Sequence, residues 1–303
     1  MSVDPADSRS AQFTNVYELG VAWMNRGHAL MQQGDGTNLT EAITSYAQAI
    51  TVFRQLPVTE NVRWANSFGA ALMNHGQLIH RVHGHARASE SFASFDRAIS
   101  ILVPLCATEP SATNPWPRRI LAGTLLNRAN LLIDLANFET AAPSARHAFA
   151  LSAPSERTEP VDAELSLKSR RAICDTLGQL LVAPGADQAA IASEASDLVD
   201  DALELIRHWS AQGQPAFTPL ASRFFRFGTQ LYRLHQVHFL GEFITENISI
   251  AGPEGKAIAL EAIDTALAAQ PVDKKFLTIG DPVSERRLQV WRELSALRDQ
   301  LLA

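Results

Sequence analysis

Apolar residues recur along this chain at helical spacing, and certain positions of the pattern repeatedly carry a small residue. Residues three and four positions apart lie on one face of a helix, so the pattern predicts helices that pack closely in pairs. One copy consists of Trp23, Gly27, Leu30 and Gly34, followed by Ala42, Tyr46 and Ala49. Another consists of Leu125, Ala129, Leu132 and Ala136, followed by Ala141, Ala145 and Ala148.

The pattern fits three further segments, so the chain contains five copies. Their central small residues are Gly27, Gly69, Ala129, Gly178 and Gly228, which are 42, 60, 49 and 50 residues apart. Repeats of this size are typical of helical arrays in which each pair packs on its neighbours, and three or more pairs are needed for stability. The sequence therefore predicts an all-α protein.

The third copy resembles the tetratricopeptide repeat most closely, from Leu125 to Ala148 without a gap, and the first copy supplies the family's Trp23, Gly27 and Tyr46. The resemblance covers most of residues 15 to 271. It implies a right-handed α-solenoid of about five antiparallel helix pairs. The second and fifth copies are longer than the family pattern, and we expect their first helices to extend to breaks at Gly84 and at 251–253.

The domain organisation follows from this pattern. We expect a flexible N-terminus over residues 1–12 and a tetratricopeptide-like array over 13–271. A linker and a C-terminal capping helix are expected over 272–303, because the end of a helical array exposes an apolar face that needs a cover. Leucines and Trp291 recur on one face of the segment after Pro282, as this role requires.

Composition and charge narrow the classes of partner. A net charge of −6 and the lack of a basic stripe argue against nucleic acid. No apolar run approaches the ~18 residues of a membrane span, and the N-terminus has no signal-peptide pattern. Only Cys106 and Cys174 are present, which favours reduced thiols. We therefore expect a cytoplasmic protein that contacts neither nucleic acid nor membrane.

Candidate chemistry is sparse. His80, His83 and His85 have spacing that can ligate zinc, with His75 upstream, but no cysteine or carboxylate lies nearby in sequence and Arg81 would repel a cation. No nucleophile elbow, phosphate-binding loop or dinucleotide fingerprint occurs. We expect no catalytic residues, no metal, no cofactor and no enzymatic activity.

The resemblance implies that the first helix of each pair lines a concave groove. The side chains mapped to this groove are Asn25, His28, Asn66, Asn74, Asn127, Asn130, Gln179, Arg226, Tyr232 and Arg233. Asn and Gln carry both a donor and an acceptor, as an extended peptide requires, and Arg can hold a carboxylate with two bonds. The alternative is that these residues only keep a helix face solvated.

The leading hypothesis is a protein-interaction module that binds a peptide segment of another protein in this groove. A second hypothesis is a ligand-responsive regulator, in which Arg226 and Arg233 hold a small anionic metabolite. The third, and the least favoured, is a metal-dependent enzyme built on the histidines.

Overall fold

The protein is described by a computed structural model, which covers residues 5–108, 114–214, 217–269 and 282–303. Over these ranges the regular structure consists of α-helices and short 3-10 turns, without a strand, and consecutive α-helices pack in pairs. The prediction of an all-α array of helix pairs is therefore confirmed. The chain divides into two compact units, Met1–Ser155 and Glu156–Ala303.

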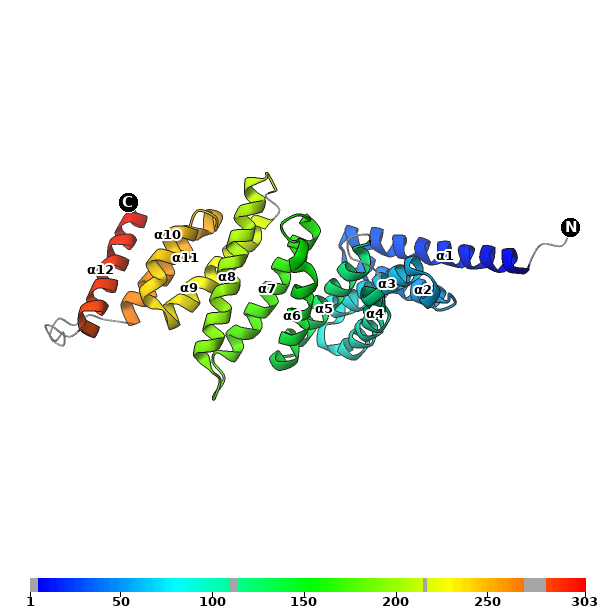
Figure 1. Ribbon diagram of the computed structural model, residues 1–303, viewed down its shortest axis with the longest axis horizontal. Coiled ribbons are helices and arrows are strands. Elements are labelled where there is room, and N and C mark those ends of the chain that lie inside the picture. Colours follow the sequence, from blue (N-terminus) through cyan, green and yellow to red (C-terminus); the bar gives the residue numbers. More distant parts are fainter. Residues whose placement is uncertain (1–4, 109–113, 215–216, 270–281) are drawn as a thin grey trace. The chain divides into compact units, whose positions relative to one another are not determined.

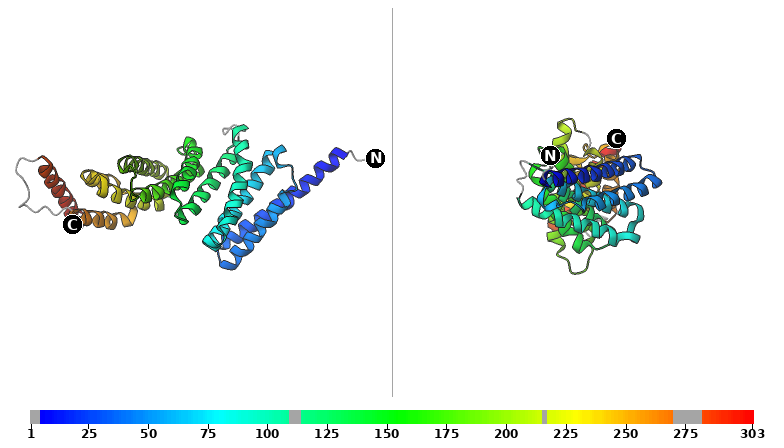
Figure 2. Two further views of the ribbon diagram at one scale, coloured as in Figure 1. Left: turned by 90° about the horizontal axis from the view of Figure 1, so that it is seen from below. Right: turned by 90° about the vertical axis from the view of Figure 1, so that its right-hand side faces the viewer.

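The N-terminal unit contains three pairs of helices (Figures 1 and 2). They are α1 (Pro5–Gln33) with α2 (Gly36–Phe53), α3 (Val62–His83) with α4 (Ala88–Thr108), and α5 (Trp116–Asp134) with α6 (Phe138–Ser152). Neighbouring pairs meet where α2 packs on α3, α4 on α5, and α3 on α5. Helix α1 begins at Pro5, so residues 5–12 are helical, whereas we had predicted a flexible segment there.

The C-terminal unit begins with a similar pair and ends differently. Its helices are α7 (Pro160–Leu180), α8 (Gln188–Ala211), α9 (Thr218–His235), α10 (Leu240–Asn247), α11 (Gly255–Ala269) and α12 (Pro282–Leu302). Helix α9 contacts α8, α10 and α11, and α12 packs on α11 and α10 through buried Leu294 (Figure 1). The expected terminal helix is present, whereas the linker predicted before it falls on residues outside the described ranges.

In the fifth copy of the pattern, the first helix is shorter than predicted. We had expected its first helix to continue through Phe243, but α9 ends at His235 and Gln236 leaves the helical conformation (φ −143°, ψ 49°). The chain then forms the separate short helix α10, and Phe243 of that helix packs on Gly228 of α9. The apolar run of the sequence is thus a second packing element and not an extension of the first.

Glycines allow large side chains to lie against the helix backbone. A methyl group added at Gly27 would lie 2.9 Å from the Tyr46 ring, and one at Gly76 would lie 2.7 Å from the Phe95 ring. At Gly228 the ring of Phe243 is closer still. These separations are below van der Waals contact, so a side chain at these positions would displace its neighbour.

The last position of the pattern has a different role in three of the five copies. Gly34, Ala136 and Gly185 have positive φ angles of 77°, 57° and 82°, and each follows the end of a first helix. No atom lies within 4 Å of a methyl group added at Gly34 or Gly185. These residues therefore adopt the left-handed conformation and turn the chain at the end of a helix. The helical pattern had implied a different role for them, the close packing of two helices.

We expect Gly228→Ala to lower the free energy of unfolding by about 1–3 kcal/mol, the usual cost of overpacking a core. Phe243 cannot move away easily, because it stacks on Phe225 and Tyr232, with ring centroids 5.7 and 4.7 Å apart. Urea denaturation measures the change. In Gly241→Ala, the control on α10, the added methyl group would make an ordinary 3.7 Å contact with Leu294. It should be neutral or stabilising, and equal stability of the two variants would contradict this packing argument.

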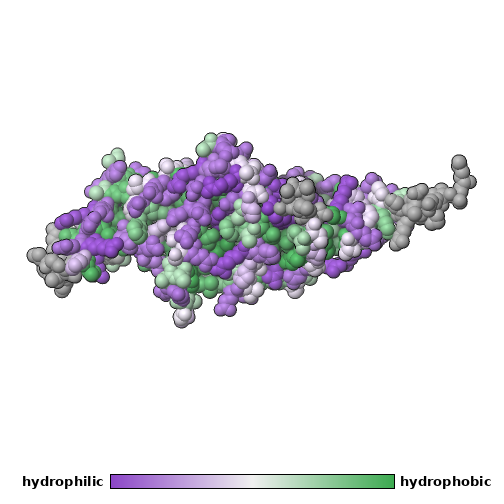
Figure 3. All heavy atoms as spheres, viewed as in Figure 1, coloured by the Kyte–Doolittle hydropathy of each residue, from purple (hydrophilic) through white to green (hydrophobic). Residues whose placement is uncertain are grey.

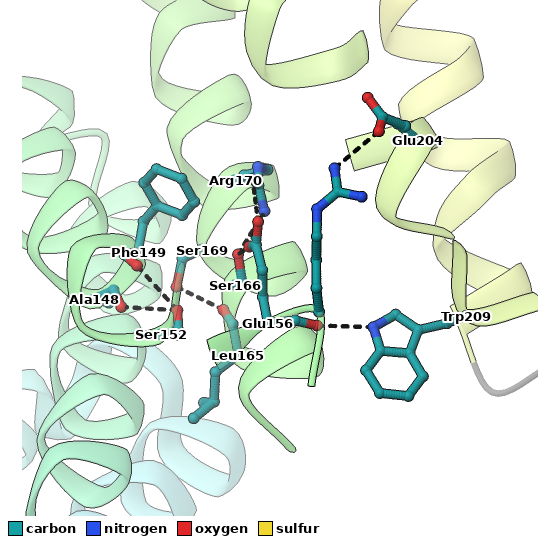
Figure 4. Close-up of polar contacts among 11 residues, drawn as sticks. Ala148, Phe149, Ser152, Glu156, Leu165, Ser166, Ser169, Arg170, Glu204 and Trp209 are labelled. Carbon is teal, nitrogen blue, oxygen red and sulfur yellow. Dashed lines mark hydrogen bonds and ion pairs between the residues drawn. The ribbon is translucent and has the colours of Figure 1, made fainter. Parts of the chain in front are cut away.

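A buried ion pair joins the first residues of the C-terminal unit to α7 (Figure 4). Arg170 Nη1 lies 2.6 Å from Glu156 Oε2, and the two side chains are 4% and 12% exposed. Ser166 donates a hydrogen bond to the same carboxylate, and Trp209 Nε1 donates to the Glu156 backbone carbonyl at 2.8 Å. Burial raises the pKa of Glu156, but the bonds from Arg170 and Ser166 outweigh burial and hold this pKa below its ordinary range.

We expect Glu156→Gln to lower the stability of the C-terminal unit by about 3–5 kcal/mol, because it removes the charge of one partner from a buried ion pair. Glu204→Gln is the matched control, since Glu204 pairs with Arg157 at 2.9 Å and both side chains are more than half exposed. That change should cost at most about 1 kcal/mol. Thermal and urea unfolding of both variants compare the two pairs, and equal losses would show that burial does not decide the effect.

Candidate functional site

The N-terminal unit has a cleft of about 490 Å³ along the first helices of its three pairs. This volume suits a few side chains of a bound segment. The residues that line the cleft come from α1, α3, α5 and the residues that precede α5: Met24, Val62, Arg63, Asn66, Ser67, Ala70, Asn114, Trp116 and Ile120. Most of the wall is apolar, with a few polar groups among the side chains.

Asn66 is the polar residue of the cleft that lacks a partner. Its Oδ1 atom is buried and accepts no hydrogen bond from any described residue. A buried acceptor without a donor costs about 1–3 kcal/mol, so natural proteins retain few of them. A donor in the cleft would remove this cost once a small shift of the neighbouring side chains uncovers the oxygen.

Trp116 is the largest apolar residue of the cleft wall and Arg63 is its charged residue. The Trp116 side chain is 58% exposed. Arg63 lies over the Tyr17 ring at 4.9 Å, and its Nε donates to the Tyr17 hydroxyl, which also meets Ser67 Oγ at 3.1 Å. These contacts hold Arg63 in place at one end of α3.

The remaining predicted residues of this unit lie outside the walls of the cleft. Asn25 and His28 are exposed on α1, and His28 contacts Gln32. Asn74 donates to the Tyr46 hydroxyl at 3.3 Å, which ties α3 to α2. Asn127 and Asn130 are half-buried on α5.

Sequence reasoning therefore found Asn66 but missed Arg63 and Trp116. The prediction assigned groove residues by their position relative to the central small residue of each first helix. Trp116 lies at the first turn of α5, thirteen residues before Ala129, and no register of that kind reaches it. The sequence signal that could have found it is a tryptophan directly after the Asn114-Pro115 helix start.

The C-terminal unit has a second cleft of about 580 Å³ between α7 and α9. Arg171, Arg223 and Arg226 line it together with Asp175 and Glu254. Burial raises the pKa of Asp175 although the nearby Arg171 and Arg223 charges act to lower it. A separate hollow of about 50 Å³ lies between α9 and α11, and both Arg226 and Arg233 line this hollow.

Two other predicted residues of this unit are placed very differently. Gln179 is exposed on α7. Tyr232 is only 9% exposed, stacks on Phe243 and donates a 3.0 Å hydrogen bond to Asp200. Burial, with the neighbouring Asp200 charge, raises the Tyr232 pKa. The prediction that Tyr232 faces the groove was wrong, because an aromatic ring at this position is needed to cover Phe243.

The histidines of the possible metal motif have protein partners. His80 Nε2 lies 2.8 Å from Asp134 of α5, and His83 contacts Arg87 at 3.0 Å. Across the described ranges no three His, Cys, Asp or Glu side chains converge as metal ligands would. No observation therefore favours the hypothesis of a metal-dependent enzyme.

His75 is a core residue. It is 8% exposed, and its Nδ1 lies 3.0 Å from Ser94 Oγ of α4. Burial lowers its pKa below the ordinary value of 6.5, while Glu90 acts against this shift. The folded N-terminal unit therefore prefers the neutral imidazole.

The stability of the N-terminal unit should consequently fall as the pH falls below 6.5. The unfolded chain binds the proton first, so the free energy of unfolding decreases by up to about 1.4 kcal/mol per pH unit until the folded pKa is reached. Urea denaturation between pH 8 and pH 5 gives the slope. His75→Gln should flatten it relative to the natural chain, whereas His147→Gln, at an exposed site on α6, should not. An unchanged slope in His75→Gln would contradict the assignment.

Comparison with known proteins does not show a family for this chain. No protein-family model matches the chain, and no curated protein matches it. Three solved structures align along most of its length. The first is a "circular tandem repeat protein with novel repeat topology", with 13% sequence identity over 96% of this chain and 71% of that chain and a TM-score of 0.37. The second is the "de novo designed helical repeat protein DHR64", with 15% identity over 95% of this chain and 97% of that chain and a TM-score of 0.21. The third is the "DHF58 filament", with 14% identity over 96% of this chain and 99% of that chain and a TM-score of 0.21.

At such TM-scores these likenesses carry no argument about a site. The chain is a helical repeat protein, as its own consecutive helix pairs show. Hydrophilic residues cover much of the face seen in Figure 3, and hydrophobic residues show between them. One segment among the described residues, Val62–Thr108, is long and apolar enough to cross a membrane, but here it forms α3 and α4, which pack on each other.

Proposed function

We propose that this protein is an interaction module of the tetratricopeptide-repeat kind, and that it binds a segment of a partner protein in the cleft of the N-terminal unit. The observation that carries the proposal is the buried Asn66 acceptor without a donor, in a cleft with otherwise mostly apolar walls. A backbone N–H of an extended segment is the donor that such an acceptor needs.

Trp116 supports the same proposal. Tryptophan is among the residues that most often dominate binding energy at protein interfaces, because its large ring is buried when the partner docks. A ring that is 58% exposed beside Met24 and Ile120 offers an anchor for an apolar side chain. A segment with one apolar anchor and a free backbone N–H nearby would therefore fit both features.

The unpaired thiols extend the proposal to location. Cys106 is half-buried and Cys174 is buried; neither forms a disulfide, and burial raises the pKa of both thiols, which disfavours the thiolate. Free thiols are typical of proteins in reducing compartments, so we propose a cytoplasmic location.

The test uses a displayed library of random peptides selected on the immobilised full-length protein, followed by fluorescence anisotropy of one selected peptide. Trp116→Ala should weaken binding at least tenfold, which corresponds to about 1.4 kcal/mol. Asn66→Leu should also weaken binding at least tenfold while leaving the protein as stable or more stable, since it removes a buried acceptor that has no donor.

Asn25→Ala is the matched control, because Asn25 lies on α1 outside the cleft. It should change the dissociation constant less than twofold. Selected peptides that bind Trp116→Ala and Asn66→Leu as tightly as the natural chain would place the binding surface elsewhere.

A further inference from the structure

Helix α9 carries three arginines on one face and no acidic residue anywhere along its length. Arg223, Arg226 and Arg233 lie at positions i, i+3 and i+10, which at 100° per residue fall within about 80° of one another around the helix. We call these three residues the arginine ridge. The chain as a whole has a net charge of −6, so the ridge is a positively charged surface on a negatively charged protein.

Hollows lie on both sides of the ridge. The 580 Å³ cleft separates it from α7, and the 50 Å³ hollow separates it from α11. Arg226 and Gln230 line both hollows, so the two form neighbouring parts of one surface along α9. Arg171 of α7 adds a further positive charge to the larger cleft.

The acids around the ridge neutralise it incompletely. Arg226 lies 3.2 Å from Glu261, whose side chain is 69% exposed, and Arg171 approaches Asp175 only to 4.0 Å. Asp175 also feels the Arg223 charge, and Glu254 lines the larger cleft, so three acids face four arginines. Arg223 and Arg233 have no ion-pair partner among the residues that the structure describes. Two guanidinium groups, one near each end of the ridge, are therefore available to a ligand.

We propose that the arginine ridge binds an acidic segment of a polypeptide in extended conformation. Along the helix axis the two available arginines, Arg223 and Arg233, are about 15 Å apart at 1.5 Å per residue, too far for one compact anion such as phosphate to bridge. Four or five residues of extended chain cover about the same distance at ~3.3 Å per residue, so carboxylates three to five residues apart would reach both ends.

The other groups of the surface suit the same ligand. The guanidinium fork of arginine matches a carboxylate with two parallel hydrogen bonds. Gln230 lies between Arg226 and Arg233 and can donate to and accept from a backbone amide of the segment. Phe224 and Phe227 provide apolar wall in the larger cleft. This surface belongs to the C-terminal unit and does not depend on the cleft around Trp116.

The test uses the full chain and a fluorescein-labelled peptide of ten residues with glutamate at every third position among serine and threonine. Its glutamine counterpart is the ligand control. The acidic peptide should bind, with an affinity that falls as NaCl rises, and the glutamine peptide should not. Substitution of all three ridge arginines by glutamine should weaken binding at least tenfold. Binding unchanged by that substitution would overturn the proposal.

The matched protein control removes the same charge elsewhere in the unit. Arg286, Arg287 and Arg292 are exposed on α12, and replacing all three by glutamine should change the affinity less than twofold. An equal loss in this control would show non-specific attraction and overturn the proposal. Trp116→Ala should leave binding of the acidic peptide unchanged, so failure here is distinguishable from failure of the proposed N-terminal cleft.

Two further measurements separate the segment from a small anion. Glu261→Gln should tighten binding about threefold or more, because it frees Arg226 from its exposed counter-ion. Inorganic phosphate and tricarballylate should each need at least ten times the peptide concentration to occupy half the sites. If either binds as tightly as the peptide, the ridge takes a small anion and the proposal of an acidic segment is wrong.

Discussion

The fold depends on the close approach of helices at positions that have no side chain. Where a glycine of one helix meets a tyrosine, phenylalanine or leucine of another, the ring or branched chain rests on the backbone itself. Such contacts recur in both units, at Gly27, Gly69, Gly76 and Gly228. Because packed interiors tolerate little change of volume, these contacts fix how closely α1 and α2, α3 and α4, and α9 and α10 approach each other.

The sequence predicted this packing because it is encoded locally. A small residue and its large partner recur at fixed helical spacing, so the pairs α1–α2, α3–α4, α5–α6 and α7–α8 were evident before the structure. The fifth copy was misjudged for a physical reason. An apolar run such as 237–243 has the same periodicity whether it extends α9 or folds back on it, and only the contact between Phe243 and Gly228 decides.

The candidate sites were less predictable, since they combine residues from helices far apart in sequence. Asn66 could be selected by register and Arg63 lies one turn away on the same helix, but Trp116 meets them only because α3 packs on α5. Tyr232 was assigned to the surface, whereas its ring completes an aromatic stack. Arg226 and Arg233 were recognised as a pair, but Arg223 and Arg171 became relevant only with α7 alongside α9.

The buried Arg170 limits where a fragment that contains the C-terminal unit can begin. Its counter-ion, Glu156, precedes α7 by several residues, and the backbone carbonyl of Glu156 accepts a bond from Trp209. Truncation at Pro160 would keep every helix of the unit and yet remove the carboxylate that lies 2.6 Å from the buried Arg170 guanidinium. An expression boundary chosen by helix ends alone would thus discard part of the core; a viable fragment must start upstream of Glu156.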